Sequence, residues 1–128
     1  MFAEVGSGLF IPPPVRGRDG MALLCPVGEL DLASENVWRR AVAEVRAAGH
    51  DHVIADCSGI TFCDSSGLNA LLSTHMSVRE TGGALVLARV PVPMRRVLEI
   101  AGTIPFLTLA ATVYDAFDLL TSPVPPTL

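Results

Sequence analysis

The sequence contains no lysine, and all nine of its basic residues are arginines. A phosphate-binding P-loop needs a lysine after its glycine-rich turn, so this class of nucleotide-binding protein is excluded. A response-regulator receiver with Asp56 as phosphoryl acceptor would also need a lysine, and an acidic pair early in the chain that is missing here. Asp56 is therefore predicted to end a buried strand.

Positive charge is scarce as well, because the nine arginines stand against 13 acidic residues and give a formal net charge of −4. Proteins that bind nucleic acid normally present a basic surface, so no direct nucleic-acid partner is expected. Long apolar runs are missing too, since a stretch such as 104–113 has only about half the length of a bilayer span. No basic residue precedes the first apolar residues, so a secretory signal is not expected. We predict a soluble, cytoplasmic protein without a membrane partner.

Cysteine and histidine are few and do not form a metal-binding motif. The five residues between Cys57 and Cys63 do not match a zinc-ligand pair, and Cys25 lies in a separate apolar run. We predict three buried, reduced thiols. His50 and His52 could in principle bind a metal, but a turn that enters a strand explains them as well, and no cofactor is expected.

The sequence does contain an alternation of short apolar runs and amphipathic segments. With 128 residues, half of them hydrophobic, the chain is long enough to form one domain with its own core. Four apolar runs are predicted to be strands: 21–27, 53–57, 84–88 and 106–110. Four segments with helical periodicity are predicted to be helices: 37–48, 68–79, 94–101 and 113–120. This order predicts an α/β fold in which helices cover a mostly parallel or mixed sheet.

The two ends of the chain depart from this pattern. Residues 1–20 are apolar enough to form an edge strand or an N-terminal extension, but Pro12, Pro13 and Pro14 cannot donate hydrogen bonds to a sheet. Residues 121–128 contain three prolines and are predicted to form a loose tail. We therefore assign the folded domain to residues 21–120.

The most informative stretch is Asp64-Ser65-Ser66-Gly67-Leu68, where an apolar run is followed by the second predicted helix. Such a strand-to-helix junction exposes free backbone N–H groups and the positive end of a helix dipole. It suits an anion, or a serine that can be converted into one. Ser65 could therefore be a helix cap, a nucleophile or a switch.

The nucleophile is the weakest of these three explanations. A serine hydrolase would use a G-x-S-x-G turn, but Cys63 stands two residues before Ser65 and Asp64 two residues before Ser66. An ordinary helix cap, which we assign to Ser66, explains part of the stretch. It does not explain Gly67, which costs up to about 1 kcal/mol relative to alanine in a helix. Close approach of a partner's backbone is one reason for a glycine there.

Three motifs occur in a defined order along the chain. Gly28-Glu29-Leu30-Asp31 precedes the first predicted helix, the run 56–68 contains the two serines, and Gly82-Gly83 precedes a predicted strand. In this order and at this separation they resemble the STAS domain, and more narrowly the bacterial anti-sigma factor antagonists. The resemblance covers about residues 21–120. It implies a four- to five-stranded mixed sheet with about four helices packed mainly on one face, and it implies no catalysis.

The resemblance also implies a set of partners and a switch. Such proteins bind an anti-sigma factor, itself a GHKL-type serine kinase, and so release a sigma factor. The kinase would phosphorylate Ser65, the first serine of the motif, and a PP2C-type phosphatase would reverse this. Asp31 matches the acidic residue of the family's first loop, near the serine. The partner-binding residues expected from the resemblance are Asp31, Asp64, Ser65, Ser66, Gly67 and Asn69.

An alternative uses the same scaffold without a kinase. The chain would then be a STAS-type interaction subunit of a lipid-transport or stressosome-like assembly. Asn69 departs from the resembled family, which often has glycine or alanine at this position.

If the kinase acts, a phosphate on Ser65 would add a charge of about −1.5 to −2 beside Asp64. We expect this charge to repel the partner without unfolding the domain.

Overall fold

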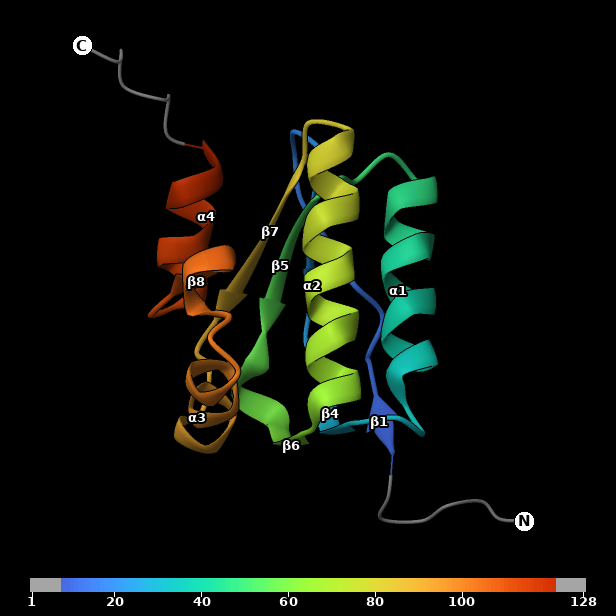
Figure 1. The fold of residues 1–128 in the computed structure, drawn as a ribbon. Coiled ribbons are helices and arrows are strands. Elements are labelled where there is room, and N and C mark those ends of the chain that lie inside the picture. The colour runs from blue at the N-terminus through green and yellow to red at the C-terminus, as the bar shows by residue number, and fades with distance from the viewer. Residues whose placement is uncertain (1–7, 122–128) are drawn as a thin grey trace, which may run out of the picture.

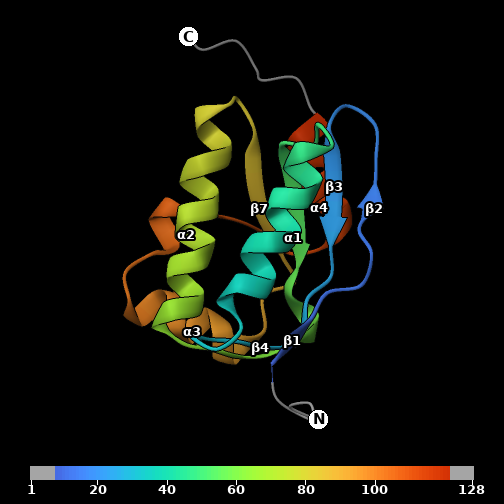
Figure 2. The same cartoon turned by 90° about the vertical axis from the view of Figure 1, so that its right-hand side faces the viewer.

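The computed structural model describes residues 8–121, and its centre is a five-stranded mixed sheet (Figures 1 and 2). The strand order is β2-β3-β5-β7-β8. Only β2 runs antiparallel to its neighbour; the other pairs are parallel. The strands of this sheet are β2 (Val15–Arg16), β3 (Met21–Leu24), β5 (His52–Asp56), β7 (Ala84–Ala88) and β8 (Thr108–Ala110).

Three of the four helices lie on the faces of this sheet, and α3 lies below it in the view of Figure 1. The two long helices, α1 and α2, lie side by side on one face, and α4 lies on the opposite face (Figures 1 and 2). The helices are α1 (Glu35–Ala47), α2 (Ser65–Glu80), α3 (Val92–Ile100) and α4 (Val113–Thr121). The predicted mixed sheet with four helices is confirmed. No helix within residues 8–121 combines the length and the apolar character that a membrane span requires.

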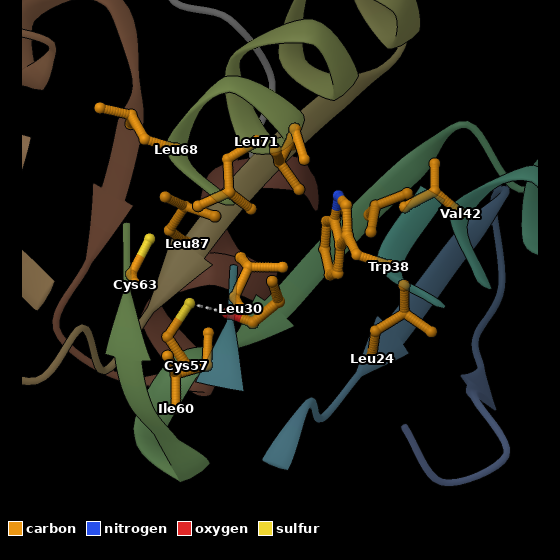
Figure 3. Packing of buried hydrophobic residues seen from close by; sticks show 14 of the residues in the cluster. Leu24, Leu30, Trp38, Val42, Cys57, Ile60, Cys63, Leu68, Leu71 and Leu87 are labelled. Atoms are coloured by element: carbon orange, nitrogen blue, oxygen red, sulfur yellow. Dashed lines mark hydrogen bonds between the residues drawn. The ribbon is translucent and has the colours of Figure 1, made fainter. Parts of the chain in front are cut away.

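The central strands are buried on both faces, which explains why their sequences are continuous apolar runs. In β5, Val53 and Ala55 belong to the core cluster beneath α1 and α2, whereas Ile54 packs in a second cluster with Ala116 of α4. The larger cluster includes Leu30, Trp38 and Leu71, all drawn in Figure 3. The indole N–H of Trp38 donates a buried hydrogen bond of 3.0 Å to Thr74 Oγ1 and so links α1 to α2.

A second, smaller sheet forms below the first and carries the site. Its three strands have the order β1-β4-β6, with β1 antiparallel and β6 parallel to β4. They are β1 (Leu9–Phe10), β4 (Val27–Leu30) and β6 (Ile60–Cys63). The prediction of one strand over 21–27 is wrong, because the chain leaves the large sheet after β3 and joins the small one at β4. Pro26, which has no N–H to donate, lies at this change of sheet.

Near the start of the described residues, positions 9–16 contain two short strands. The short strands β1 and β2 lie at sheet edges on either side of Pro12, Pro13 and Pro14, as expected for a proline-rich segment. The apolar run 2–5, also considered for a strand, lies outside the described residues. The tail predicted for 121–128 lies outside them as well, except for Thr121, which ends α4.

Candidate functional site

The candidate site lies at the connection between β6 and α2, at the end of the molecule where both long helices begin (Figure 1). β6 ends at Cys63 and α2 begins at Ser65, with Asp64 between them. The parallel pairing of β4 with β6 places Leu30 opposite Cys63. The residues that follow each strand, Asp31 and Asp64, are therefore brought to the same edge of the small sheet, as the sequence resemblance implies.

Asp64 is the residue that caps α2, so the assignment of the cap to Ser66 is wrong. Its Oδ1 atom accepts a hydrogen bond of 2.9 Å from the backbone N–H of Gly67, three residues into the helix start. Its Oδ2 atom accepts a second one, of 3.3 Å, from the N–H of Leu32 in the loop before α1. Asp64 thus connects the start of α2 to the loop before α1, and Ser66 is simply the second residue of α2.

Asp31 is engaged within its own loop. Its Oδ1 atom accepts a hydrogen bond of 3.1 Å from the backbone N–H of Ser34, and its own backbone N–H donates one of 3.0 Å to the Ser34 hydroxyl. The Ser34 hydroxyl, which is buried, also donates to the Glu29 carbonyl. Asp31 therefore shapes the loop that leads into α1, and the next residue of that loop, Leu32, contacts Asp64.

Gly67 faces the interior of the protein. A Cβ atom at this position would overlap the backbone carbonyl of Leu30, a fully buried residue at the end of β4. The glycine therefore allows α2 to lie against β4. The explanation offered from the sequence, a close approach by a partner's backbone, is wrong: the backbone that comes close belongs to this chain.

Ser65 and Asn69 are the two predicted site residues that are exposed on α2, and Ser66 is half-buried. The Ser65 hydroxyl makes no hydrogen bond to any residue between 8 and 121, so it is available to a modifying enzyme. Two large apolar side chains near the junction are also exposed, Leu32 at 70% and Phe62 at 50%. Sequence reasoning missed both. The β-branched and aromatic composition of Ile60–Cys63 was the available signal for β6 and hence for Phe62.

Of the other candidates from the sequence, His52 lies apart from this site, whereas Cys63 directly precedes Asp64 at the junction. His52 begins β5 and is at the opposite end of that strand from the junction (Figure 1). Cys57 and Cys63 are buried and Cys25 is partly buried, all with free thiols. Burial, followed by the charge of Asp64, raises the pKa of Cys63 to about 11, so this thiol stays protonated near neutral pH.

Asp56 ends β5, as predicted, and is held by an arginine. Arg89 Nη2 donates to Asp56 Oδ2 at 2.9 Å and to Ser58 Oγ at 2.8 Å, while its Nε donates to Asp56 Oδ1 at 3.1 Å. Burial raises the pKa of Asp56, but the hydrogen bonds from Arg89 and Ser58 outweigh this and bring the pKa below its ordinary value. The carboxylate therefore serves as an ion-pair partner that ties β5 to the end of β7.

Asp56→Asn is expected to lower the free energy of unfolding by about 1 kcal/mol near pH 7, because it removes the ion pair with Arg89. The loss is no larger because Arg89 is half-exposed, so water partly screens the ion pair. The pKa of Asp56 is lower in the folded protein than the unfolded value near 3.9. Its contribution is therefore complete above about pH 4 and is lost as the pH falls through the folded pKa. Urea unfolding at about pH 7 and pH 3 should show a difference between wild type and variant that narrows on acidification.

The matched control for this experiment is Asp118→Asn, which changes an exposed carboxylate on α4. It should alter the free energy of unfolding by less than about 0.5 kcal/mol. A difference between wild type and Asp56→Asn that widens at low pH would contradict the assignment.

The family model of the STAS domain matches residues 12–116, most of the chain. The chain belongs to the STAS domain family. The resemblance noted in the sequence is thereby confirmed, and the junction at Ser65 lies within the matched residues.

Several anti-sigma factor antagonists are similar to this chain in sequence or in structure. The anti-sigma-F factor antagonist RsfB of Mycobacterium tuberculosis is 30% identical over 102 residues, which cover 80% of this chain and 83% of RsfB. An anti-sigma factor antagonist from Mycobacterium paratuberculosis has a structure similar to this one, with a TM-score of 0.73 at 24% identity over 93% of this chain and 98% of that one. Unphosphorylated SpoIIAA superposes with a TM-score of 0.74 at 21% identity, over 90% and 99% of the two chains. Phosphorylated SpoIIAA of Bacillus gives 0.65 at 21% identity, over 86% and 98%.

Proposed function

We propose that this STAS domain is an anti-sigma factor antagonist. In this role it binds an anti-sigma factor that is a GHKL-type serine kinase and so releases a sigma factor for transcription. Phosphorylation of Ser65 by the kinase switches the binding off, and a PP2C-type phosphatase restores it. The role requires binding and not catalysis by this chain. The observation that carries the proposal is the exposed, unbonded hydroxyl of Ser65 on the first residue of α2.

The position of Ser65 supports a switch that leaves the fold intact. Since its hydroxyl makes no hydrogen bond within residues 8–121, a phosphate there would break no contact of the folded domain. The start of α2 can partly stabilise the phosphate through its dipole, by about 0.3–1 kcal/mol at an exposed position. The fold is therefore expected to tolerate phosphorylation.

The surroundings of Ser65 support an effect on binding. A phosphate would add about −1.5 to −2 charge next to the carboxylate of Asp64. That carboxylate already occupies the Gly67 N–H at the helix start, so this donor is not available to the phosphate. The new charge would project from a surface that also exposes Leu32 and Phe62, apolar groups of the kind that partners cover. Covering this surface would then bury an unpaired charge.

The six residues predicted for partner binding thus take two roles in the proposal. Ser65 and Asn69 would touch the partner directly, because both are exposed on α2. The half-buried Ser66 would contribute at the rim of the contact. Three residues would act indirectly, by holding the junction in shape: Asp31, Asp64 and Gly67.

Intact mass spectrometry tests the proposal. The full chain is incubated with ATP and, one at a time, with each serine-kinase anti-sigma factor encoded in the same genome. One kinase should add a single phosphate to the wild type and none to Ser65→Ala. Ser58→Ala, which changes another exposed serine, should still be phosphorylated.

The contrary outcomes are equally definite. A phosphate on any residue other than Ser65, or no phosphate with any of these kinases, would contradict the switch. Co-purification of the tagged chain with a transporter ATPase, or as a large homo-assembly, would instead support the interaction subunit of a lipid-transport or stressosome-like complex.

A further inference from the structure

A surface groove lies between α2 and the segment 101–108 that links α3 to β8. In Figures 1 and 2 this segment, coloured orange, runs beside α2. The groove has a volume of about 950 Å³. Leu72 and Met76 line it from α2, and Phe106 and Leu107 line it from the segment opposite.

Two large apolar side chains are exposed on the walls of the groove. Met76 is 65% exposed and Phe106 is 67% exposed, on opposite sides. Both are large and sit in a depression, where they can be covered together. Side chains of this kind, grouped in one place, mark interaction sites more often than single exposed apolar residues do.

Two residues of opposite charge, Arg79 and Glu80, lie next to each other at one end of the groove. Arg79 lines it and has no carboxylate within ion-pair distance in the part of the chain that the structure describes, whereas Arg39 is paired with Glu35 at 3.1 Å. Burial and then the charge of Arg79 lower the pKa of His75, so its imidazole is neutral near pH 7. Glu80 is the one carboxylate among the lining residues of the groove. The guanidinium of Arg79 is therefore free to pair with a carboxylate from outside.

The groove continues the surface that carries Ser65. Ser65, Asn69, Leu72 and Met76 follow one another at intervals of four, three and four residues and so form one stripe along α2. Asn69 belongs both to the predicted binding residues and to the lining of the groove. From Ser65 to Met76 the stripe is about 16 Å long, at 1.5 Å per residue. A partner that covers the groove would thus end close to Ser65.

We propose that this groove binds an amphipathic helix of the anti-sigma factor, with apolar side chains between Met76 and Phe106 and a carboxylate on Arg79. This inference rests on the proposed function and names the surface through which it is exercised. A helix fits because one wall of the groove is itself a helix, and the grooves between its side-chain ridges can accept the side chains of a second helix. Laying an apolar helix face into a groove is a common way to recognise a partner.

Three variants test the groove: Met76→Glu, Phe106→Glu and Arg79→Glu. Each changes an exposed side chain, so the domain should remain folded by circular dichroism. The probes are the serine-kinase anti-sigma factors of the same genome, and affinity is measured by titration calorimetry with the one that binds wild type. Each variant is expected to bind at least about tenfold more weakly, which corresponds to about 1.4 kcal/mol.

The matched control is Leu119→Glu. Leu119 is an apolar residue of α4 on the opposite face of the sheet, and at 55% its exposure is close to that of Met76. This variant should bind within about twofold of wild type, since a change outside an interface leaves the contact intact. Loss of binding in the control as well as in the groove variants would overturn the proposal.

The remaining outcomes separate this proposal from the function on which it rests. Binding that is weakened by Ser65→Asp but unchanged by the three groove variants would overturn the groove and leave the proposed function standing. Absence of binding to every kinase would overturn both. A wild-type dimer in light scattering that Met76→Glu converts to a monomer would assign the groove to a second copy of the chain and also overturn the proposal.

Discussion

Ser65→Asp is expected to weaken binding to the cognate anti-sigma factor by about tenfold to a hundredfold, whereas Ser65→Ala should bind like wild type. The aspartate places a permanent negative charge on the surface that the partner covers, where the charge would be buried without a partner of opposite sign. A tenfold to hundredfold loss of affinity corresponds to about 1.4–2.8 kcal/mol. Phosphoserine, with nearly twice the charge, should weaken binding further. Titration calorimetry of the two variants and of the phosphorylated protein measures the series.

Stability and binding should respond differently to this substitution. A negative side chain on the first residue of a helix interacts favourably with the helix dipole, so Ser65→Asp should leave the free energy of unfolding unchanged or raise it by up to about 1 kcal/mol. The matched control is Thr112→Asp, because Thr112 caps α4 through a 2.9 Å hydrogen bond from the Asp115 N–H on the opposite face of the sheet. It should not affect binding. Equal affinities for Ser65→Asp and Ser65→Ala would show that Ser65 is no switch.

The elements that the sequence predicted well are those with a strong local pattern. β5 and β7 lie in continuous apolar runs because both faces of the central sheet are covered, and their positions follow from that alone. The helix over 68–79 is equally well marked by its periodicity and is found at Ser65–Glu80. In each of these cases the nearest neighbours in sequence determine the structure.

The elements of the site depend on long-range pairing and were predicted less well. β4 and β6 have four residues each, too few to show a period, and they form by pairing with each other and, in the case of β4, with β1. The hydrogen bond from Leu32 to Asp64 joins residues 32 positions apart, so no local pattern could reveal that Asp64 links two loops. The strand-to-helix junction before α2 was predictable from the sequence, but the hydrogen bonds of Asp31 and Asp64 were not.

The apolar side of α2 shows a related difficulty. The sequence places Leu68, Leu71 and Met76 on one side of the helix, but the structure divides that side. Leu68 and Leu71 are buried in the core, whereas Met76 is 65% exposed in the groove. In the sequence, the whole apolar stripe of a helix looks like a core face. If the stripe is wider than the neighbouring elements can cover, part of it stays exposed, and only the tertiary structure shows which part.

Gly67→Ala is expected to lower the free energy of unfolding by about 2 kcal/mol or more. Alanine would favour the helix by up to about 1 kcal/mol, so local propensity alone predicts stabilisation. Its Cβ atom, however, would overlap the Leu30 carbonyl oxygen and lie 2.9 Å from both the Leu30 carbonyl carbon and its Cγ atom. Leu30 is fully buried and ends β4, so neither its backbone nor its side chain can move aside freely. Overpacking of this kind typically costs 1–3 kcal/mol, occasionally more, and outweighs the propensity.

Urea unfolding of Gly67→Ala against Gly17→Ala decides between packing and propensity as the reason for this glycine. At Gly17 an added Cβ would meet only ordinary contacts, the nearest 3.5 Å away at Met21 Cβ, so that variant should remain within about 0.5 kcal/mol of wild type. If Gly67→Ala were as stable as wild type or more stable, the close packing of α2 on β4 would not be the reason for the glycine. If it is destabilised as expected, the start of α2 must shift away from β4, which also displaces Ser65. Any kinase that reads the position of Ser65 should then phosphorylate Gly67→Ala more slowly, even under conditions in which the variant remains folded.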